Sequence, residues 1–345
     1  MAERPIVEPV VREHVELAAF FWAQRDSLLQ EDLPDHEAVA SVDARLEANL
    51  DALRIAGEAA WPFIVRAFET FPEKGELFVA ALRAVETGDA RRIEQAVGFA
   101  RVAEDGPRGL CGAFEWLPPR TTRDLVQDWV HASDPIRCEA AIAALRAHAA
   151  DPGPLLQRLL AHEAAGVRAA ACGLAAALGR QDAVPALRDA LGDADASVRE
   201  RAATALARLG HRDGEEVLKA RIRALEEGWE HLLRALVAAT PDRDLRAWLK
   251  EMNGTAENRV IAVRAAGMLG DRSLADWIIA QMSNPVVADA ASDAFLDLFP
   301  EARADDLWTQ DIAVLDPAFR ELELPPDGFP DAAAFRGWLA RHGPS

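Results

Sequence analysis

The sequence has no tyrosine, only three cysteines and no long hydrophobic run. The cysteines, Cys111, Cys138 and Cys172, are too few and too scattered for a disulfide framework or a zinc site. No stretch reaches the ~18 apolar residues that a membrane-spanning helix needs. The first residues also lack the basic segment and apolar run of a signal peptide. We therefore expect a cytoplasmic protein that does not insert into a membrane.

Basic residues are scarce relative to acidic ones, with 38 against 57 and a formal net charge of −19. Because nucleic-acid affinity depends on lysine and arginine displacing counterions, this balance argues against a DNA- or RNA-binding protein. Negative charge gathers at the ends: residues 1–70 hold 14 acidic and 6 basic groups, and residues 297–345 hold 10 and 4. Residues 134–223 are balanced, with 12 and 13. The acidic ends therefore favour a protein partner with a basic surface.

The motifs of common catalytic sites are missing as well. The eight histidines never take the H-E-x-x-H or H-x-x-x-H spacing that places two metal ligands on one helix face. No glycine-rich loop precedes Lys-Ser or Lys-Thr, and G-x-S-x-G and S-x-x-K do not occur. Cys111 has no histidine-containing motif beside it, so we interpret it as a small packed hydrophobic residue. We accordingly expect no catalytic residue, no cofactor and no metal.

The feature that recurs is a helical repeat. The pairs Ile136-Arg137, Val167-Arg168 and Val198-Arg199 lie 31 residues apart, and each opens an alanine-rich stretch. Two of these stretches close on Leu178-Gly179 and Leu209-Gly210, and glycine at this place is typical of a helix end. A second helix follows each stretch. The pattern predicts helical hairpins that must stack on their neighbours to bury their apolar faces.

Weaker copies of this unit extend the repeat in both directions, for roughly seven or eight hairpins. They occupy Leu77–Ala100, Gly109–Val130, Trp229–Met252, Val260–Met282 and Val286–Phe299. The best-formed unit, Val198-Arg-Glu-Arg-Ala-Ala-Thr-Ala-Leu-Ala-Arg-Leu209 with Gly210 and a second helix, resembles the short HEAT-like repeats first described in bilin-lyase-type proteins. The resemblance covers about residues 75–300. It implies an all-α fold, an α-solenoid of stacked HEAT-like hairpins, which serves enzymes and scaffolds alike.

The two ends of the chain depart from the repeat. The string from His14 through Phe21-Trp22 to Trp61 resembles the N-terminus of an uncharacterised proteobacterial HEAT-repeat family, some members of which are encoded near type VI secretion genes. Asn49 and Ala52 stand where that family has His and Gly. We expect irregular caps at both ends of the chain. The expected segments are an N-terminal helical cap segment at 1–72, the repeat solenoid at 73–303, and a C-terminal extension at 304–345. Within the extension we expect a loop over Leu324–Pro330 and a short helix over Asp331–Arg341.

Two sets of repeat positions predict the polar and apolar faces. Arg137, Arg168 and Arg199 recur at equal spacing, so we expect them to stack as a structural ladder with nearby acids such as Asp134 and Asp195. The helix opened by each Val-Arg pair is expected to line the concave side. Its outward positions are then Cys138, Ala169 and Glu200; Ile142, Gly173 and Thr204; Leu145, Ala176 and Ala207. Since only Glu200 is ionisable, this predicts a smooth groove without the converging polar groups of a catalytic site.

Aromatic residues mark the ends of the chain as the place for a partner. No Phe or Trp occurs between Trp129 and Trp229. Interface hot spots are enriched in Trp and Arg, so a partner that docks through such anchors would use the flanks. The candidate partner-binding residues are Trp22, Arg54, Trp61, Trp229 and Trp308. The alternative is that these rings fill the cores of the irregular terminal repeats, where alanine cannot fill the space.

These observations leave three functions open, with the oligomeric state undetermined. The first is a non-catalytic adaptor or scaffold that binds another protein, with a link to type VI secretion implied by the N-terminal resemblance. The second is a lyase or cofactor-modifying enzyme of the bilin-lyase HEAT type, with its site in the flanking segments. The third is an immunity-like protein that neutralises a toxin. The smooth groove and the missing catalytic motifs favour the first.

Overall fold

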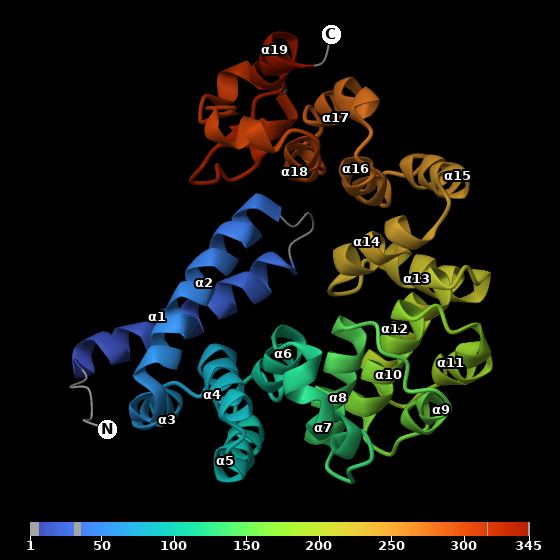
Figure 1. Cartoon of the computed structure of the whole chain (residues 1–345). Coiled ribbons are helices and arrows are strands. Elements are labelled where there is room, and N and C mark those ends of the chain that lie inside the picture. The colour runs from blue at the N-terminus through green and yellow to red at the C-terminus, as the bar shows by residue number, and fades with distance from the viewer. Residues whose placement is uncertain (1–6, 31–35, 316, 344–345) are drawn as a thin grey trace. The chain divides into compact units, whose positions relative to one another are not determined.

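The computed structural model describes residues 7–30, 36–315 and 317–343. Within these ranges the regular secondary structure is helical apart from one pair of two-residue strands, which confirms the prediction of an all-α fold (Figure 1). The chain divides into two compact units, Met1–Leu209 and Gly210–Ser345. The predicted boundaries at 72 and 303 stay a prediction.

The Met1–Leu209 unit is built from twelve α-helices within its described residues. They are α1 (Glu8–Leu28), α2 (His36–Ala56), α3 (Trp61–Thr70), α4 (Lys74–Thr87), α5 (Ala90–Ala100), α6 (Arg108–Trp116), α7 (Pro119–Trp129), α8 (Pro135–Ala147), α9 (Leu155–Leu160), α10 (Ala165–Ala177), α11 (Val184–Ala190) and α12 (Ala196–Arg208). One continuous hydrophobic core runs through these helices. Alanine supplies much of it, so the helices pack closely.

Most of these helices form hairpins stacked in two layers. Helices α4, α6, α8, α10 and α12 pack against one another in that order and make up what we call the first layer. Helices α5, α7, α9 and α11 cover one side of it and form the second layer (Figure 1). The other side of the first layer carries the candidate site described below.

The repeat positions explain where the hairpin helices begin and end. Asp134 and Asp195 are N-caps, and their carboxylates accept hydrogen bonds from the first free backbone N–H groups of α8 and α12. At the other ends, Gly179 and Gly210 adopt φ angles of +64° and +81°. These left-handed conformations suit glycine and end α10 and α12 where the sequence predicts.

The N-terminal helices dock on the first layer through a buried carboxylate. Asp26 of α1 is only 2% exposed. It accepts hydrogen bonds from Lys74 of α4 at 2.8 Å and from Arg108 of α6 at 2.6 and 2.9 Å. Burial by itself raises the pKa of Asp26, but the hydrogen bonds and positive charges of Arg108 and Lys74 outweigh it and lower the pKa below its ordinary value. One carboxylate thus ties three helices together.

The Gly210–Ser345 unit continues the hairpins and ends in an irregular segment. Its helices are α13 (Arg212–Arg223), α14 (Trp229–Ala239), α15 (Asp242–Asn253), α16 (Arg259–Met268), α17 (Ala275–Gln281), α18 (Ala288–Leu298) and α19 (Ala332–His342). Leu324–Pro330, expected as a loop, is one in part: its last two residues form β2 (Phe329–Pro330), which pairs antiparallel with β1 (Trp308–Thr309). Helix α19 packs on α17, and Phe335 and Trp338 fill a core with Phe295 and Phe299.

Candidate functional site

The structure places two of the predicted partner-binding residues in contacts within the protein. Trp22 is 2% exposed, and its ring stacks on Phe78 with 4.7 Å between the ring centroids. Arg54 donates hydrogen bonds to three carboxylates, those of Glu47, Asp51 and Glu86, at 2.5 to 2.9 Å. The ring of Trp22 and the guanidinium of Arg54 are thus both occupied by contacts within the protein.

The other three predicted anchors are half-buried tryptophans. Trp61 lies under the guanidinium of Arg92, at 5.0 Å from the ring centroid. Trp308 meets the ring of Phe335 edge-on, at 5.4 Å between centroids. Trp229 is the first residue of α14. These rings lie on separate elements, and none of them lines the pocket described below.

The three arginines of the predicted ladder each hold a neighbouring loop or acid. Arg168 donates two hydrogen bonds to Asp193, at 2.7 and 2.8 Å, and a further pair to the carbonyl oxygens of residues 162 and 163. Arg199 donates to the carbonyl oxygens of residues 193 and 194, in the same relative place. Arg137 pairs with Glu94 at 2.6 Å and with Asp134 at 3.3 Å. Asp195 serves as the cap of α12.

The prediction of a smooth groove is wrong on α8 and α12, where charged residues next to the predicted positions line this face. The predicted positions Ile142, Ala169 and Gly173 line it as expected. Cys138 and Ala207 are buried at 1% and 0% exposed. The positions that open to solvent include 139 and 146 on α8 and 201 on α12, which the predicted stripe left out. Adjacent helix residues point about 100° apart, so a one-residue offset brings Glu139, Arg146 and Arg201 to this face in place of Cys138, Leu145 and Glu200. The groove is therefore polar.

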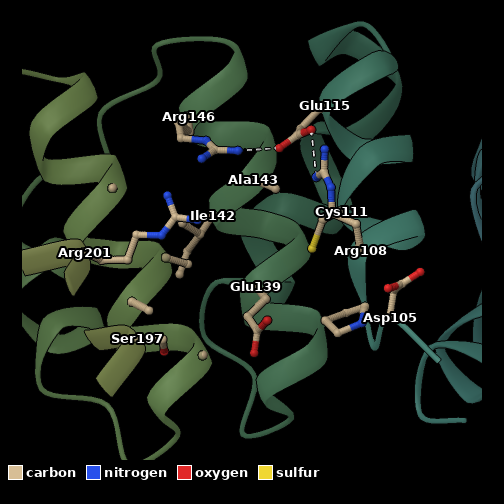
Figure 2. Close-up of a pocket in the computed structure, with 15 residues that line it drawn as sticks. Asp105, Arg108, Cys111, Glu115, Glu139, Ile142, Ala143, Arg146, Ser197 and Arg201 are labelled. Carbon is tan, nitrogen blue, oxygen red and sulfur yellow. Dashed lines mark hydrogen bonds and ion pairs between the residues drawn. The ribbon is translucent and has the colours of Figure 1, made fainter. Parts of the chain in front are cut away.

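This face holds a pocket of about 330 Å³ in the Met1–Leu209 unit (Figure 2). Its middle is lined by α10, which contributes only glycine and alanine there. Helices α6 and α8 supply one wall, and α12 supplies the opposite wall. The charged residues that line it are Asp105, Arg108, Glu115, Glu139, Arg146 and Arg201, beside the thiol of Cys111. The sequence signal for Arg108 and Glu115 is weak because α6 lacks the Val-Arg pair that identifies the other repeats.

Part of this charge is neutralised inside the pocket. Glu115 accepts a hydrogen bond from Arg146 at 2.6 Å and another from Arg108 at 3.2 Å, as the dashed lines in Figure 2 mark. Arg108 also pairs with the buried Asp26. Arg108 and Glu115 therefore belong to the network that holds α1, α4, α6 and α8 together.

Apart from the exposed Asp105, two charged side chains of the pocket stay outside that network. Within the described residues, Arg201 and Glu139 make no ion pair or side-chain hydrogen bond, with each other or with a third group. Withdrawal from bulk water and the positive charges of Arg146, Arg208 and Arg108 lower the pKa of Arg201, against the opposing effect of Glu200. Withdrawal from water raises the pKa of Glu139. These two groups are where the pocket can still bind a charged ligand.

The thiol in the pocket is poorly suited to nucleophilic chemistry. Burial, assisted by the negative charges of Glu139 and Glu115, raises the pKa of Cys111 to about 12. Burial also raises the pKa of Cys172 to about 12 and that of Cys138. The thiolate is the reactive form of cysteine, so little of it exists near neutral pH.

We therefore expect Cys111 and Cys172 of the native protein to react with iodoacetamide roughly 100-fold more slowly than free cysteine near neutral pH, and Cys138, which is buried, to react more slowly as well. Because the pKa of each thiol is raised, the rate should climb only in strongly alkaline solution. Mass spectrometry of the alkylated peptides measures each site. The same chain in denaturant is the control and should react at the rate of free cysteine, whereas rapid labelling of native Cys111 would contradict the expectation.

Comparisons with known proteins support the repeat fold. Among the described residues, no helix combines the length and the apolar character needed to cross a bilayer. No three His, Cys, Asp or Glu side chains meet as metal ligands in this part of the chain. No curated protein and no solved structure was found that matches the chain. Residues 152–253, which include α10, α12 and Arg201, match the family model of HEAT repeats, and this match agrees with the all-α, HEAT-like solenoid fold.

Proposed function

We propose that this chain is a non-catalytic scaffold or adaptor that binds another protein. HEAT repeats commonly serve protein interaction, and the repeat match covers the helices that form one side of the pocket. The observation that carries the proposal is the polar pocket on the first layer, where charged side chains from three helices surround a floor of small residues. The high pKa of Cys111 supports binding at this pocket over nucleophilic catalysis.

We further propose where this protein acts and what kind of partner it binds. We place the protein in the cytoplasm, in a proteobacterium, and without nucleic acid as its ligand. The net charge of −19 favours a partner with a basic surface region, whose binding should weaken as the salt concentration rises. The resemblance of the N-terminal segment to a family with members near type VI secretion genes makes a component or effector of such a system the candidate partner.

The test is affinity purification of partners from the source organism with the full chain as bait at low salt. Variants Arg201→Glu and Arg158→Glu reverse the charge of two exposed arginines in the same unit. Arg201 lines the pocket, whereas Arg158 lies on α9 in the second layer and serves as the matched control. We expect a partner that is recovered with the wild type and with Arg158→Glu, and that is lost with Arg201→Glu.

The outcomes distinguish two questions, whether the chain binds a protein and whether it does so at the pocket. Recovery of the same partner with every variant would support a protein-binding scaffold and contradict its placement at the pocket. If no protein is enriched over the blank resin at low salt, the proposed function itself is overturned. Circular dichroism of each variant verifies that the chain is folded.

A further inference from the structure

The pocket on the first layer presents two opposite charges across a gap. Helix α10 lies between α8 and α12 and lines the pocket with Gly166, Ala169, Ala170 and Gly173. None of these side chains extends beyond Cβ. The neighbouring helices bear longer side chains, with Glu139 on α8 and Arg201 on α12. The pocket is thus a trough with a carboxylate on one side and a guanidinium on the other (Figure 2).

Arg201 is available to bind an anionic group. Figure 2 shows its side chain extended from α12 toward Ile142 of α8, and no dashed line joins it to a carboxylate. The nearby acceptor Glu115 is already occupied by Arg146 and Arg108. Positive charge from Arg146 adds to that of Arg201, as the lowered pKa of Arg201 reflects. A carboxylate placed here would gain charge-assisted, bidentate hydrogen bonds.

Glu139 is available to bind a cationic group. Its carboxylate lies against Gly166, where a Cβ atom would come within 2.3 Å of Glu139 Oε1, so the glycine makes room for it. No basic side chain of the described residues forms an ion pair with it. A half-buried carboxylate without a partner is costly, and a bound ammonium or guanidinium group would offset that cost.

We propose that this pocket binds a segment of a partner protein that carries an acidic side chain for Arg201 and a basic side chain for Glu139. The inference rests on the proposed protein-binding function and specifies its partner. A volume of about 330 Å³ is at the small end of ligand pockets and suits one or two side chains. The requirement for both charges would give specificity, because a segment with only one leaves the other pocket charge unpaired.

The experiment uses short peptides as defined probes for the full chain. Acetylated and amidated peptides carry one Lys and one Glu, in either order, with no spacer up to a few alanines between them. Matched analogues replace the Lys or the Glu with Gln. Binding is measured by saturation-transfer NMR and by isothermal titration. We expect at least one doubly charged peptide to bind about tenfold more tightly than both of its singly charged analogues.

Four variants assign that preference to the pocket. Arg201→Gln should abolish the advantage of the Glu side chain, and Glu139→Gln should abolish the advantage of the Lys side chain. Arg158→Gln and Glu163→Gln, at exposed positions outside the pocket, should leave both advantages intact. Because Arg201 and Glu139 make no internal ion pair in the described chain and their charges are withdrawn from water, their Gln variants should unfold at the wild-type temperature or above it.

Three results would overturn the inference. The first is equal binding of doubly and singly charged peptides. The second is a preference that survives both Arg201→Gln and Glu139→Gln. The third is binding of free zwitterionic amino acids, tested with lysine and glutamate, in the absence of any peptide binding, which would assign the pocket to a small metabolite. A protein partner that is still recovered by affinity purification in any of these cases would leave the proposed scaffold function standing.

Discussion

Replacing Asp26 with Ala is expected to lower the free energy of unfolding by about 3 kcal/mol. The carboxylate is buried and bonded to Lys74 and Arg108, so its removal leaves Lys74 without its ion pair and Arg108 with Glu115 alone. Lys74 and Arg108 are 21% and 33% exposed, and water therefore offsets part of the loss. Urea denaturation of the full chain, followed by tryptophan fluorescence, measures the change. Trp22 lies one turn from Asp26, so the summed emission of the nine tryptophans includes a contribution from this part of the core.

An exposed ion pair serves as the control, and the pH dependence tests whether the negative charge of Asp26 is what stabilises the fold. Asp51 is 63% exposed and pairs with Arg54, so Asp51→Ala should cost about 0.5 kcal/mol or less. The folded-state pKa of Asp26 is lowered, so its contribution is fully present above the pKa of an unfolded aspartate and is lost as the pH falls through the folded value. The wild type should therefore lose its advantage over Asp26→Ala in acid. An equal difference between them in acid and at neutral pH would contradict the ion-pair account.

Replacing Gly109 with Ala is expected to cost about 2 to 3 kcal/mol of stability, because it separates α6 from α4. A Cβ atom at this position would lie 2.2 Å from the carbonyl oxygen of Lys74 and 2.8 Å from the backbone nitrogen of Phe78. Both are backbone atoms, so no rotamer change relieves the clash, and the helices themselves must move. The same strain disturbs Lys74 and Arg108, which hold Asp26. The melting temperature of the full chain measures the loss.

Gly98 offers the matched control on the neighbouring helix α5. No atom lies within 4 Å of a Cβ built there, and the residue is exposed. Gly98→Ala should raise stability by about 0.5 to 1 kcal/mol, because alanine is the better helix former. Opposite signs for the two substitutions would confirm that close helix contact, and not helix propensity, governs Gly109. A neutral Gly109→Ala variant would contradict the contact.

The aromatic residues show why sequence position alone did not identify the binding site. Trp22 occurs in an N-terminal segment rich in aromatic residues, which is compatible with an interface anchor or with a core residue. Only the packing of α1 on α4 and α6 decides between them, because it places the ring against Phe78 and over Gly112. A Cβ at Gly112 would meet the Trp22 ring at 2.1 Å, so the small residue on α6 and the large one on α1 fit together.

The sequence by itself determined the local structure of the repeat. The recurrence of Ile-Arg and Val-Arg pairs every 31 residues, with Gly210 after a helix, predicts the hairpins and where their first helices end, because a left-handed glycine acts within a few residues. The tertiary structure decided which side of each helix is exposed. A helix turns about 100° per residue, so the choice between 138 and 139 depends on how neighbouring helices approach. That packing brings Glu139 and Arg201 to one pocket from helices separated by α10, and nothing local to either residue encodes it.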